Sequence, residues 1–404
     1  MQAASAEAFK GAGNCGHPDL KAAESDESIE RKMQSLTGFF GRHRRLLIGV
    51  DISDTQVRVV SLSKQAGRYR VEGYCIGELA DGAVEDGVIG DVDTVALCLE
   101  RLVERMGLRT HGAALAIKSG AAFTKHVMLD STLARREIEE LMLVEAESSL
   151  PYALDEVYLD YAIADGVIAG AARRPQKMLL VACKHDVLDP RVRVAEQARL
   201  QVEAVDLESF ALQRVLSRHS NLESGGYSGQ QKAEQTGLVA LILLESKLSS
   251  VHFFRKGEHK LSWDWRRKKA GSASAFGSVS ADVDACGLDD FDACISGETR
   301  GKHSEAGTER CKAIANEIAT QVCLAIGQLP NDVVASAISQ AILGGADAQE
   351  AGLAEMIAES LLCQVGLANP FLDMTLAEGL DPLVIDQDAP LLMVACGLAL
   401  RQLR

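Results

Sequence analysis

The 404-residue sequence lacks the patterns that mark membrane-spanning, secreted and disulfide-rich proteins. Its longest apolar stretches, residues 237–244 and 389–400, are shorter than the roughly 20 residues that a spanning helix requires. The chain begins without the basic region, apolar core and small-residue cleavage site of a secretion signal. Its ten cysteines include no close pair of the kind that structural zinc sites use. We therefore expect a cytoplasmic protein with no transmembrane segment.

The sequence also lacks an excess of basic residues. It has 42 Lys and Arg against 57 Asp and Glu, which gives a formal net charge of −15. Proteins that bind nucleic acids normally present a basic face that displaces counterions from phosphates, so we expect no nucleic-acid partner. The hydrophobic content of 47% and the length are sufficient for two folded lobes, each with its own core.

Residues 46–63 (LLIGVDISDTQVRVVSLS) have the pattern of strand, turn and strand. An apolar run ends at Asp51, a polar turn follows, and apolar residues then alternate with polar ones. Such a hairpin suits an anion, because turn amides and hydroxyls can surround a phosphate while the carboxylate holds a hydrated magnesium ion. Ser, Asp and Thr also occur in ordinary turns, where their side chains bond their own backbone. The hairpin alone leaves both interpretations open.

Four later segments appear in a characteristic order: VEAVDLESF at 202–210, AILGG at 341–345, NPFLDM at 369–374 and APLLMVACGLALRQL at 389–403. Together with the first hairpin they resemble the type IV pilus assembly protein PilM family, which has an actin-like fold. The resemblance extends from about residue 33 to the C-terminus, and residues 256–310 match poorly.

The resemblance implies an α/β, actin-like (ribonuclease H-like) fold of two lobes. We predict a disordered tail at residues 1–42 and lobe one at 43–218, with a small α+β subdomain inserted at 113–186. Lobe two then covers residues 219–404. It includes a low-complexity stretch at 266–308, and its final helix returns to lobe one.

In the actin-like superfamily one hairpin from each lobe and a Gly-rich turn hold ATP with magnesium. The resemblance gives Asp51 the role of holding the magnesium-bound water, and Arg58 stands where the family often has Lys. The candidate nucleotide-binding residues are Asp51, Ser53, Asp54, Thr55, Gly344, Gly345 and Ala346. The pair Gly344–Gly345 is equally compatible with a plain turn between a strand and a helix.

The second hairpin, residues 239–257, departs from the family pattern at two positions. Leu243 replaces an expected Asp and cannot orient a magnesium-bound water. Glu245 replaces an expected Gly, so it crowds and repels a phosphate. Lys247, Ser249 and Ser250 offer partial compensation. We expect ATP binding to be weakened or lost, and no efficient hydrolysis.

The resemblance implies an adaptor of the pilus inner-membrane alignment complex, peripheral to the inner membrane, that binds the cytoplasmic N-terminal tail of PilN alongside other inner-membrane components. Helix 135–150 and strand 123–129 are the candidates for lining that groove. The alternative is an ATP-dependent kinase or ATPase of the same superfamily, with Asp206 and Glu208 as its carboxylates. A third reading, a division protein resembling FtsA, requires a terminal amphipathic helix that does not follow the apolar segment 389–400.

Overall fold

The structure is a computed structural model that describes residues 47–401, except 66, 108–111, 131, 164–174, 223–236, 268–304, 331–332 and 334–337. The predicted tail, residues 1–42, and most of the predicted low-complexity stretch lie outside the described residues.

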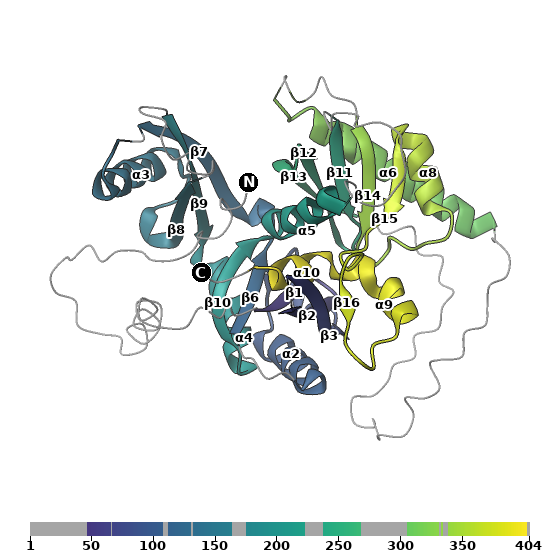
Figure 1. The fold of residues 1–404 in the computed structure, drawn as a ribbon. Coiled ribbons are helices and arrows are strands. Elements are labelled where there is room, and N and C mark those ends of the chain that lie inside the picture. Colours follow the sequence, from purple (N-terminus) through teal and green to yellow (C-terminus); the bar gives the residue numbers. More distant parts are fainter. Residues whose placement is uncertain are drawn as a thin grey trace.

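Lobe one is built on a six-stranded mixed sheet (Figure 1). Its strands, in spatial order, are β10 (Gln201–Leu207), β6 (Gly112–Ile117), β1 (Ile48–Ile52), β2 (Gln56–Gln65), β3 (Arg68–Glu78) and β16 (Thr375–Leu376). The first hairpin is confirmed, with Asp51 opposite Arg58 across the antiparallel pair β1–β2. The parallel strands β1, β6 and β10 end at the same edge, so residues that follow them come together there.

Helices cover both faces of this sheet. On one face lie α2 (Val92–Met106) and α4 (His185–Gln197), and a small hairpin of β4 (Val84–Glu85) and β5 (Val88–Ile89) joins the same core. Helix α2 begins at Asp91, whose side chain accepts a hydrogen bond from the Thr94 amide, and ends at Gly107 in the left-handed conformation. On the other face lie α5 (Glu208–Leu222) and α10 (Met393–Ala399).

The inserted subdomain is a three-stranded antiparallel sheet in the order β7, β9, β8, packed against one helix (Figure 1). Its elements are β7 (Ala122–Asp130), α3 (Arg135–Ser149), β8 (Val157–Ile163) and β9 (Pro175–Lys184), with the short 3-10 helices η1 (Ser119–Ala121) and η2 (Leu154–Glu156). The predicted start at residue 113 is wrong. Residues 112–117 form β6, a strand of the large sheet that pairs with both β1 and β10 and is almost wholly buried.

Lobe two contains a five-stranded sheet in the order β13, β12, β11, β14, β15. The strands are β11 (Leu238–Leu243), β12 (Leu248–Arg255), β13 (Glu258–Arg266), β14 (Ile338–Gly344) and β15 (Gln364–Leu367), and the helices packed on them are α6 (Glu305–Ile326) and α8 (Leu353–Leu361). Sequence patterns predicted the hairpin β11–β12 and strand β14 but missed β13 and β15.

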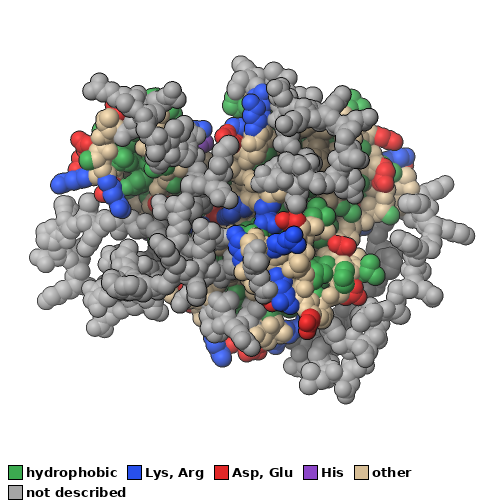
Figure 2. Space-filling model, viewed as in Figure 1, with side chains coloured by type: hydrophobic (Ala, Val, Ile, Leu, Met, Phe, Trp, Pro, Cys, Tyr) green, Lys and Arg blue, Asp and Glu red, His purple; other side chains and the backbone are tan. Residues whose placement is uncertain are grey.

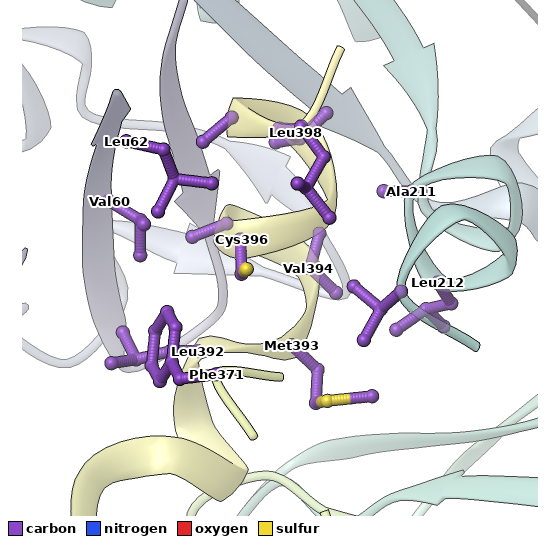
Figure 3. Packing of buried hydrophobic residues seen from close by; sticks show 14 of the residues in the cluster. Val60, Leu62, Ala211, Leu212, Phe371, Leu392, Met393, Val394, Cys396 and Leu398 are labelled. Atoms are coloured by element: carbon purple, nitrogen blue, oxygen red, sulfur yellow. The ribbon is translucent and has the colours of Figure 1, made fainter. Parts of the chain in front are cut away.

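The C-terminal segment joins the lobes. Helix α9 (Pro382–Asp388), the 3-10 helix η4 (Ala389–Leu392) and α10 follow one another, and α10 lies between the lobe-one sheet and α5 (Figure 3). Residues Pro382–Ala399 are long and apolar enough to cross a membrane by composition, but 61% of this stretch is buried inside the molecule. A β-carbon at Gly49 of β1 would lie 1.9 Å from the carbonyl oxygen of Ala395, so only glycine permits α10 to pack this closely. The predicted return of the final helix to lobe one therefore agrees with the packing.

Candidate functional site

The turn of the first hairpin satisfies its own polar groups. The Ser53 hydroxyl donates to the Gln56 carbonyl oxygen at 3.1 Å and accepts a hydrogen bond from the Gln56 amide at the same distance. The Thr55 amide also donates to Ser53 Oγ, at 3.5 Å. Asp54 Oδ1 accepts from the Gly87 amide at 2.8 Å. The predicted turn at residues 53–55 therefore forms, and the Ser53 hydroxyl and one oxygen of Asp54 bond other groups of the protein.

Arg58 is the centre of the candidate site. Its guanidinium lies 3.4 Å from Asp51 Oδ2 and donates from Nη2 to Glu245 Oε2 of lobe two at 2.8 Å. Gln56 Oε1 accepts two further hydrogen bonds from the same group, at 3.1 and 2.9 Å. Burial opposes the charge of Arg58, yet the carboxylates of Glu245 and Asp51 outweigh it and raise the pKa of this side chain. The two hairpins are thus bridged by a buried ion pair.

The two departures of the second hairpin have distinct structural roles. Leu243 is 4% exposed and packs in the apolar core between the lobes. Glu245 is 5% exposed and directs its carboxylate to Arg58. Its amide donates to Ser249 Oγ at 3.1 Å, and that hydroxyl donates back to the Glu245 carbonyl oxygen at 3.0 Å, which closes the turn.

The three residues expected to compensate for these departures are engaged elsewhere. Lys247 pairs with Asp81 across the lobes at 2.9 Å, Ser249 closes its own turn, and Ser250 Oγ lies 3.1 Å from His252 Nε2.

Gly344 and Gly345 lie beside the second hairpin. Gly345 has a φ of +92°, and a β-carbon there would lie 2.4 Å from the carbonyl oxygen of Leu244. Its amide donates to the Pro390 carbonyl oxygen at 2.8 Å, and the Leu244 amide donates to the Gly344 carbonyl oxygen at 2.7 Å. Close backbone packing within the protein therefore accounts for both glycines without a ligand. Ala346 follows in the same turn.

Four further charged or polar residues lie near the ion pair: Lys118, His252 and Asp264, which the sequence analysis did not name, and Glu208, which it named only as a kinase carboxylate. Lys118 Nζ lies 3.4 Å from Glu208 Oε1, and His252 Nε2 lies 3.8 Å from Glu208 Oε2. Asp264 of β13 adds another carboxylate beside Lys118. Glu208 and Asp264 attract the Lys118 ammonium and raise its pKa against the effect of burial. Burial lowers the pKa of His252 to about 3, so its imidazole is neutral near pH 7 and its contact with Glu208 is not an ion pair.

The charge balance of the cluster differs from that of a phosphate site. Four carboxylates, Asp51, Glu208, Glu245 and Asp264, lie in the cluster with the cations Arg58 and Lys118, and the buried Arg191 also interacts with Asp51 and Glu208. Burial raises the pKa of Asp51 to about 6, despite the opposing effect of Arg58. A triphosphate needs donors and positive charge that no internal group already uses. The charge of Arg58 is directed to Glu245 rather than to a phosphate.

A pocket of about 540 Å³ opens in lobe two beside this cluster. Helix α6 forms one wall, and Arg266, Arg267, Arg310 and Asp347 are among its lining residues. Each of these arginines already has an acidic partner: Arg266 pairs with Asp86, Arg267 with Asp347 and Arg310 with Glu350.

The carboxylates proposed for a kinase have different surroundings. Asp206 is buried between Arg214 of α5 and Arg401, whose Nη1 lies 3.2 Å from Asp206 Oδ2. Glu208 reaches the cluster through Lys118. Asp206 thus fastens α5 and the end of the chain to the sheet, and of these two carboxylates only Glu208 lies in the site.

The sequence contained one unused signal for the missed residues. Lys118 directly follows the apolar strand β6, at the edge of the sheet where the ends of the parallel strands meet. His252 and Asp264 carry no comparable signal, because they lie inside strands of the second lobe. Two of the predicted residues, from opposite lobes, lie near the turn that contains Glu245. Asp51 of lobe one interacts electrostatically with Glu245, and Gly345 of lobe two packs against Leu244, the residue before Glu245.

Comparisons with known proteins point in one direction. Residues 49–403 match the sequence profile of a family described as type IV pilus assembly protein PilM. The chain is similar to a solved structure described as a PilM–PilN type IV pilus biogenesis complex, with a TM-score of 0.67 and 15% identity over 89% of this chain and 98% of that one. The predicted actin-like fold is confirmed.

Two further solved structures are similar over most of their length. The ethanolamine utilization protein EutJ from Carboxydothermus hydrogenoformans matches with a TM-score of 0.43 and 12% identity, over 88% of this chain and 90% of that one. MreB5 of Spiroplasma citri bound to ADP matches with a TM-score of 0.41 and 12% identity, over 87% of this chain and 94% of that one.

Proposed function

Because the chain belongs to the PilM family of type IV pilus assembly proteins, we propose that it is an adaptor that binds the cytoplasmic N-terminal tail of PilN without ATP hydrolysis. The choice of partner rests on the neighbour described as a PilM–PilN complex. In this proposal the protein is held at the inner membrane by that partner and contacts other inner-membrane components of the pilus machine.

One observation carries the nucleotide part of the proposal: the ion pair between Arg58 and Glu245. In a nucleotide-dependent relative of this fold, the phosphates bridge the hairpins of the two lobes. Here a carboxylate of lobe two bonds directly to the cation of lobe one, and both side chains are almost completely buried. The protein thus supplies the bridging anion itself, which makes the closed arrangement of the lobes independent of ATP.

The inserted subdomain supports the tail-binding part of the proposal. Met128 of β7 is 59% exposed, on the sheet face away from the Val127 and Leu129 side chains that pack with α3. Val144 is 64% exposed on the side of α3 that faces away from the sheet, so these two side chains lie on opposite surfaces of the subdomain. Strand β7 is an edge strand of its sheet, to which an extended peptide can add through main-chain hydrogen bonds. An apolar segment of the tail that adds to β7 would cover Met128, which otherwise remains in water.

The kinase alternative gains no support from its two carboxylates. Asp206 is completely buried in its pairs with Arg214 and Arg401, so it has no free side to present to a substrate. Glu208 lies in the cluster, but the second hairpin, which would hold the phosphates in a kinase, carries Glu245.

The proposal is tested by titrating the protein into a fluorescently labelled peptide from the PilN cytoplasmic tail, with and without magnesium ATP. We expect saturable binding with the same dissociation constant in both conditions. Met128→Asp should weaken binding about tenfold or more, since it places a charge where the apolar segment would lie. Leu97→Asp is the matched control, because Leu97 is 48% exposed on α2, outside the subdomain.

Each possible result of this titration leads to a different conclusion. Binding that appears only with magnesium ATP would show that the nucleotide still controls the protein. Equal weakening by Leu97→Asp and Met128→Asp would remove the subdomain from the binding site. A complete lack of binding would refute PilN as the partner.

A further inference from the structure

The charges of the chain are distributed very unevenly. Residues 313–400 contain eleven Asp and Glu but no Lys, Arg or His. Some of these acids are paired within the protein, as in Arg267–Asp347, Arg310–Glu350 and Arg218–Asp373. Among the described residues, six others form no ion pair: Glu355, Glu359, Glu378, Asp381, Asp386 and Asp388. This part of lobe two therefore presents negative charge that no neighbouring cation neutralises.

Large apolar side chains are exposed along the same part of the chain. Leu362 ends helix α8 with a 90% exposed side chain and a positive φ of 53°. Leu367, at the end of β15, is 52% exposed, and Leu372 in the following turn is 67% exposed. On α9, Leu383 is 73% exposed. Scattered apolar residues are normal on a surface, but several large exposed leucines in one segment indicate a binding surface.

Strand β15 offers a backbone edge between these leucines. It pairs with β14 on one side and has no strand on the other among the described residues. The Ala368 amide donates to Leu343 of β14 at 2.7 Å. Because strand residues alternate in direction, the amides and carbonyls of Val365 and Leu367 point to the open side. The strand has neither the Lys nor the Pro that commonly protects such an edge.

Hydrogen bonds connect the edge strand to α9. Asn369, just after β15, donates from Nδ2 to Asp386 Oδ1 at 3.0 Å. Gln349, before α8, donates to the Gln387 carbonyl oxygen at the end of α9. Helices α8 and α9 lie with β15 along one side of the molecule (Figure 1). Hydrophobic and acidic side chains occur together over the region of α9 (Figure 2).

We propose that this surface, formed by Leu362, the open edge of β15, Leu372 and α9, binds a basic amphipathic segment of a partner protein. The segment adds to β15 as an extended strand, bonding the backbone of Val365 and Leu367. Its alternate apolar side chains cover Leu367, Leu372 and Leu383, while its Lys or Arg residues face Glu359, Glu378 and the other unpaired acids. The negative charge selects a basic segment over a second copy of this acidic surface, which would repel it.

The experiment uses the full-length protein and a labelled peptide of about ten residues in which Lys alternates with Val or Leu. Binding is followed by fluorescence anisotropy, and amide hydrogen exchange reports on β15. We expect saturable binding that weakens with salt, together with slower exchange at Val365 and Leu367. The same peptide with Glu in place of Lys should not bind.

Two surface variants test the location. Leu367→Lys and Leu383→Lys should each weaken peptide binding about tenfold, because they place a cation against the basic segment. Val144→Lys on α3 is the matched control, since it adds the same charge to an exposed apolar position on the inserted subdomain. All three positions are largely exposed, so the variants should fold normally.

Three results would overturn the proposal. The first is peptide binding without slower exchange at β15. The second is equal weakening by Val144→Lys and Leu367→Lys, which would indicate general attraction to an acidic protein. The third is slower β15 exchange with rising protein concentration in the absence of peptide, which would assign this edge to a second copy of the chain.

Discussion

Arg58 of lobe one donates a 2.8 Å hydrogen bond to Glu245 of lobe two, and both side chains are almost completely withdrawn from solvent. Asp51, the residue predicted to hold a magnesium-bound water, is the second carboxylate beside the same guanidinium. The Arg58–Glu245 pair therefore lies where the two hairpins meet, and in the proposed function it takes the place of a bridging phosphate.

Breaking this pair from either side should destabilise the protein. Removing one partner of a buried ion pair typically costs about 3–5 kcal/mol, because the other charge is left without compensation. We expect large losses for Arg58→Met and for Glu245→Gln, and a double variant less destabilised than the sum of the two. Urea unfolding of the four proteins in a double-mutant cycle gives the coupling free energy.

The matched control is the exposed pair Lys247–Asp81, which also joins the lobes. Asp81 is 94% exposed in its side chain, so Lys247→Met should change stability little. Additive effects of the Arg58 and Glu245 substitutions would show that the pair does not hold the lobes together.

The Gly344–Gly345 turn gives a second prediction, which separates packing from backbone strain. Gly345 and Gly379 have nearly the same φ, +92° and +93°, but only Gly345 has backbone atoms where a β-carbon would lie. Gly379→Ala should cost about 1–2 kcal/mol from the left-handed conformation alone. Gly345→Ala should cost clearly more, because Leu244 has to move. Equal losses in thermal or urea unfolding would contradict the packing role.

The buried carboxyl of Asp51 gives a pH-dependent prediction. Its native pKa is about 6, while an unfolded Asp titrates near 3.9. Between these values the native state keeps a proton that the unfolded state has lost. The free energy of unfolding should therefore fall as pH rises from about 4 to about 6, and this contribution should level off above that range.

Asn at position 51 cannot titrate, so Asp51→Asn should remove this part of the pH dependence. Relative to the wild type, the variant should gain about 1–3 kcal/mol between pH 4 and pH 6. Urea unfolding at several pH values measures the difference. A pH-independent difference would mean that Asp51 has a normal pKa in the folded protein.

Local sequence patterns predicted many of the elements in lobe one. Helix α2 has clear local boundary signals, because Asp91 caps its start and Gly107 ends it. The first hairpin follows from an alternating apolar pattern around a polar turn. The inserted subdomain was placed five or more residues too early, since β6 and β7 are both strands and local patterns do not say which sheet a strand joins.

Local sequence patterns could not predict contacts between residues that are far apart in the chain. Arg58 and Glu245 are 187 residues apart, and nothing near either residue indicates the other. The sequence showed that Glu245 is unsuitable next to a phosphate, but not that it bonds Arg58. Strands β13 and β15 were missed because they are edge strands with little buried surface, and their apolar content is correspondingly weak. The glycine turn was recognised, while its tight contact with Leu244 needed the three-dimensional fold.

The most direct test of the central claim is to measure the affinity of a fluorescent ATP analogue with magnesium for the wild type and for Glu245→Gly. If Glu245 takes the place of the phosphate, the wild type should bind weakly or not at all, and Glu245→Gly should bind at least about tenfold more tightly, because Arg58 becomes free for an anion. Micromolar binding by the wild type, with steady phosphate release and no gain from Glu245→Gly, would contradict the account.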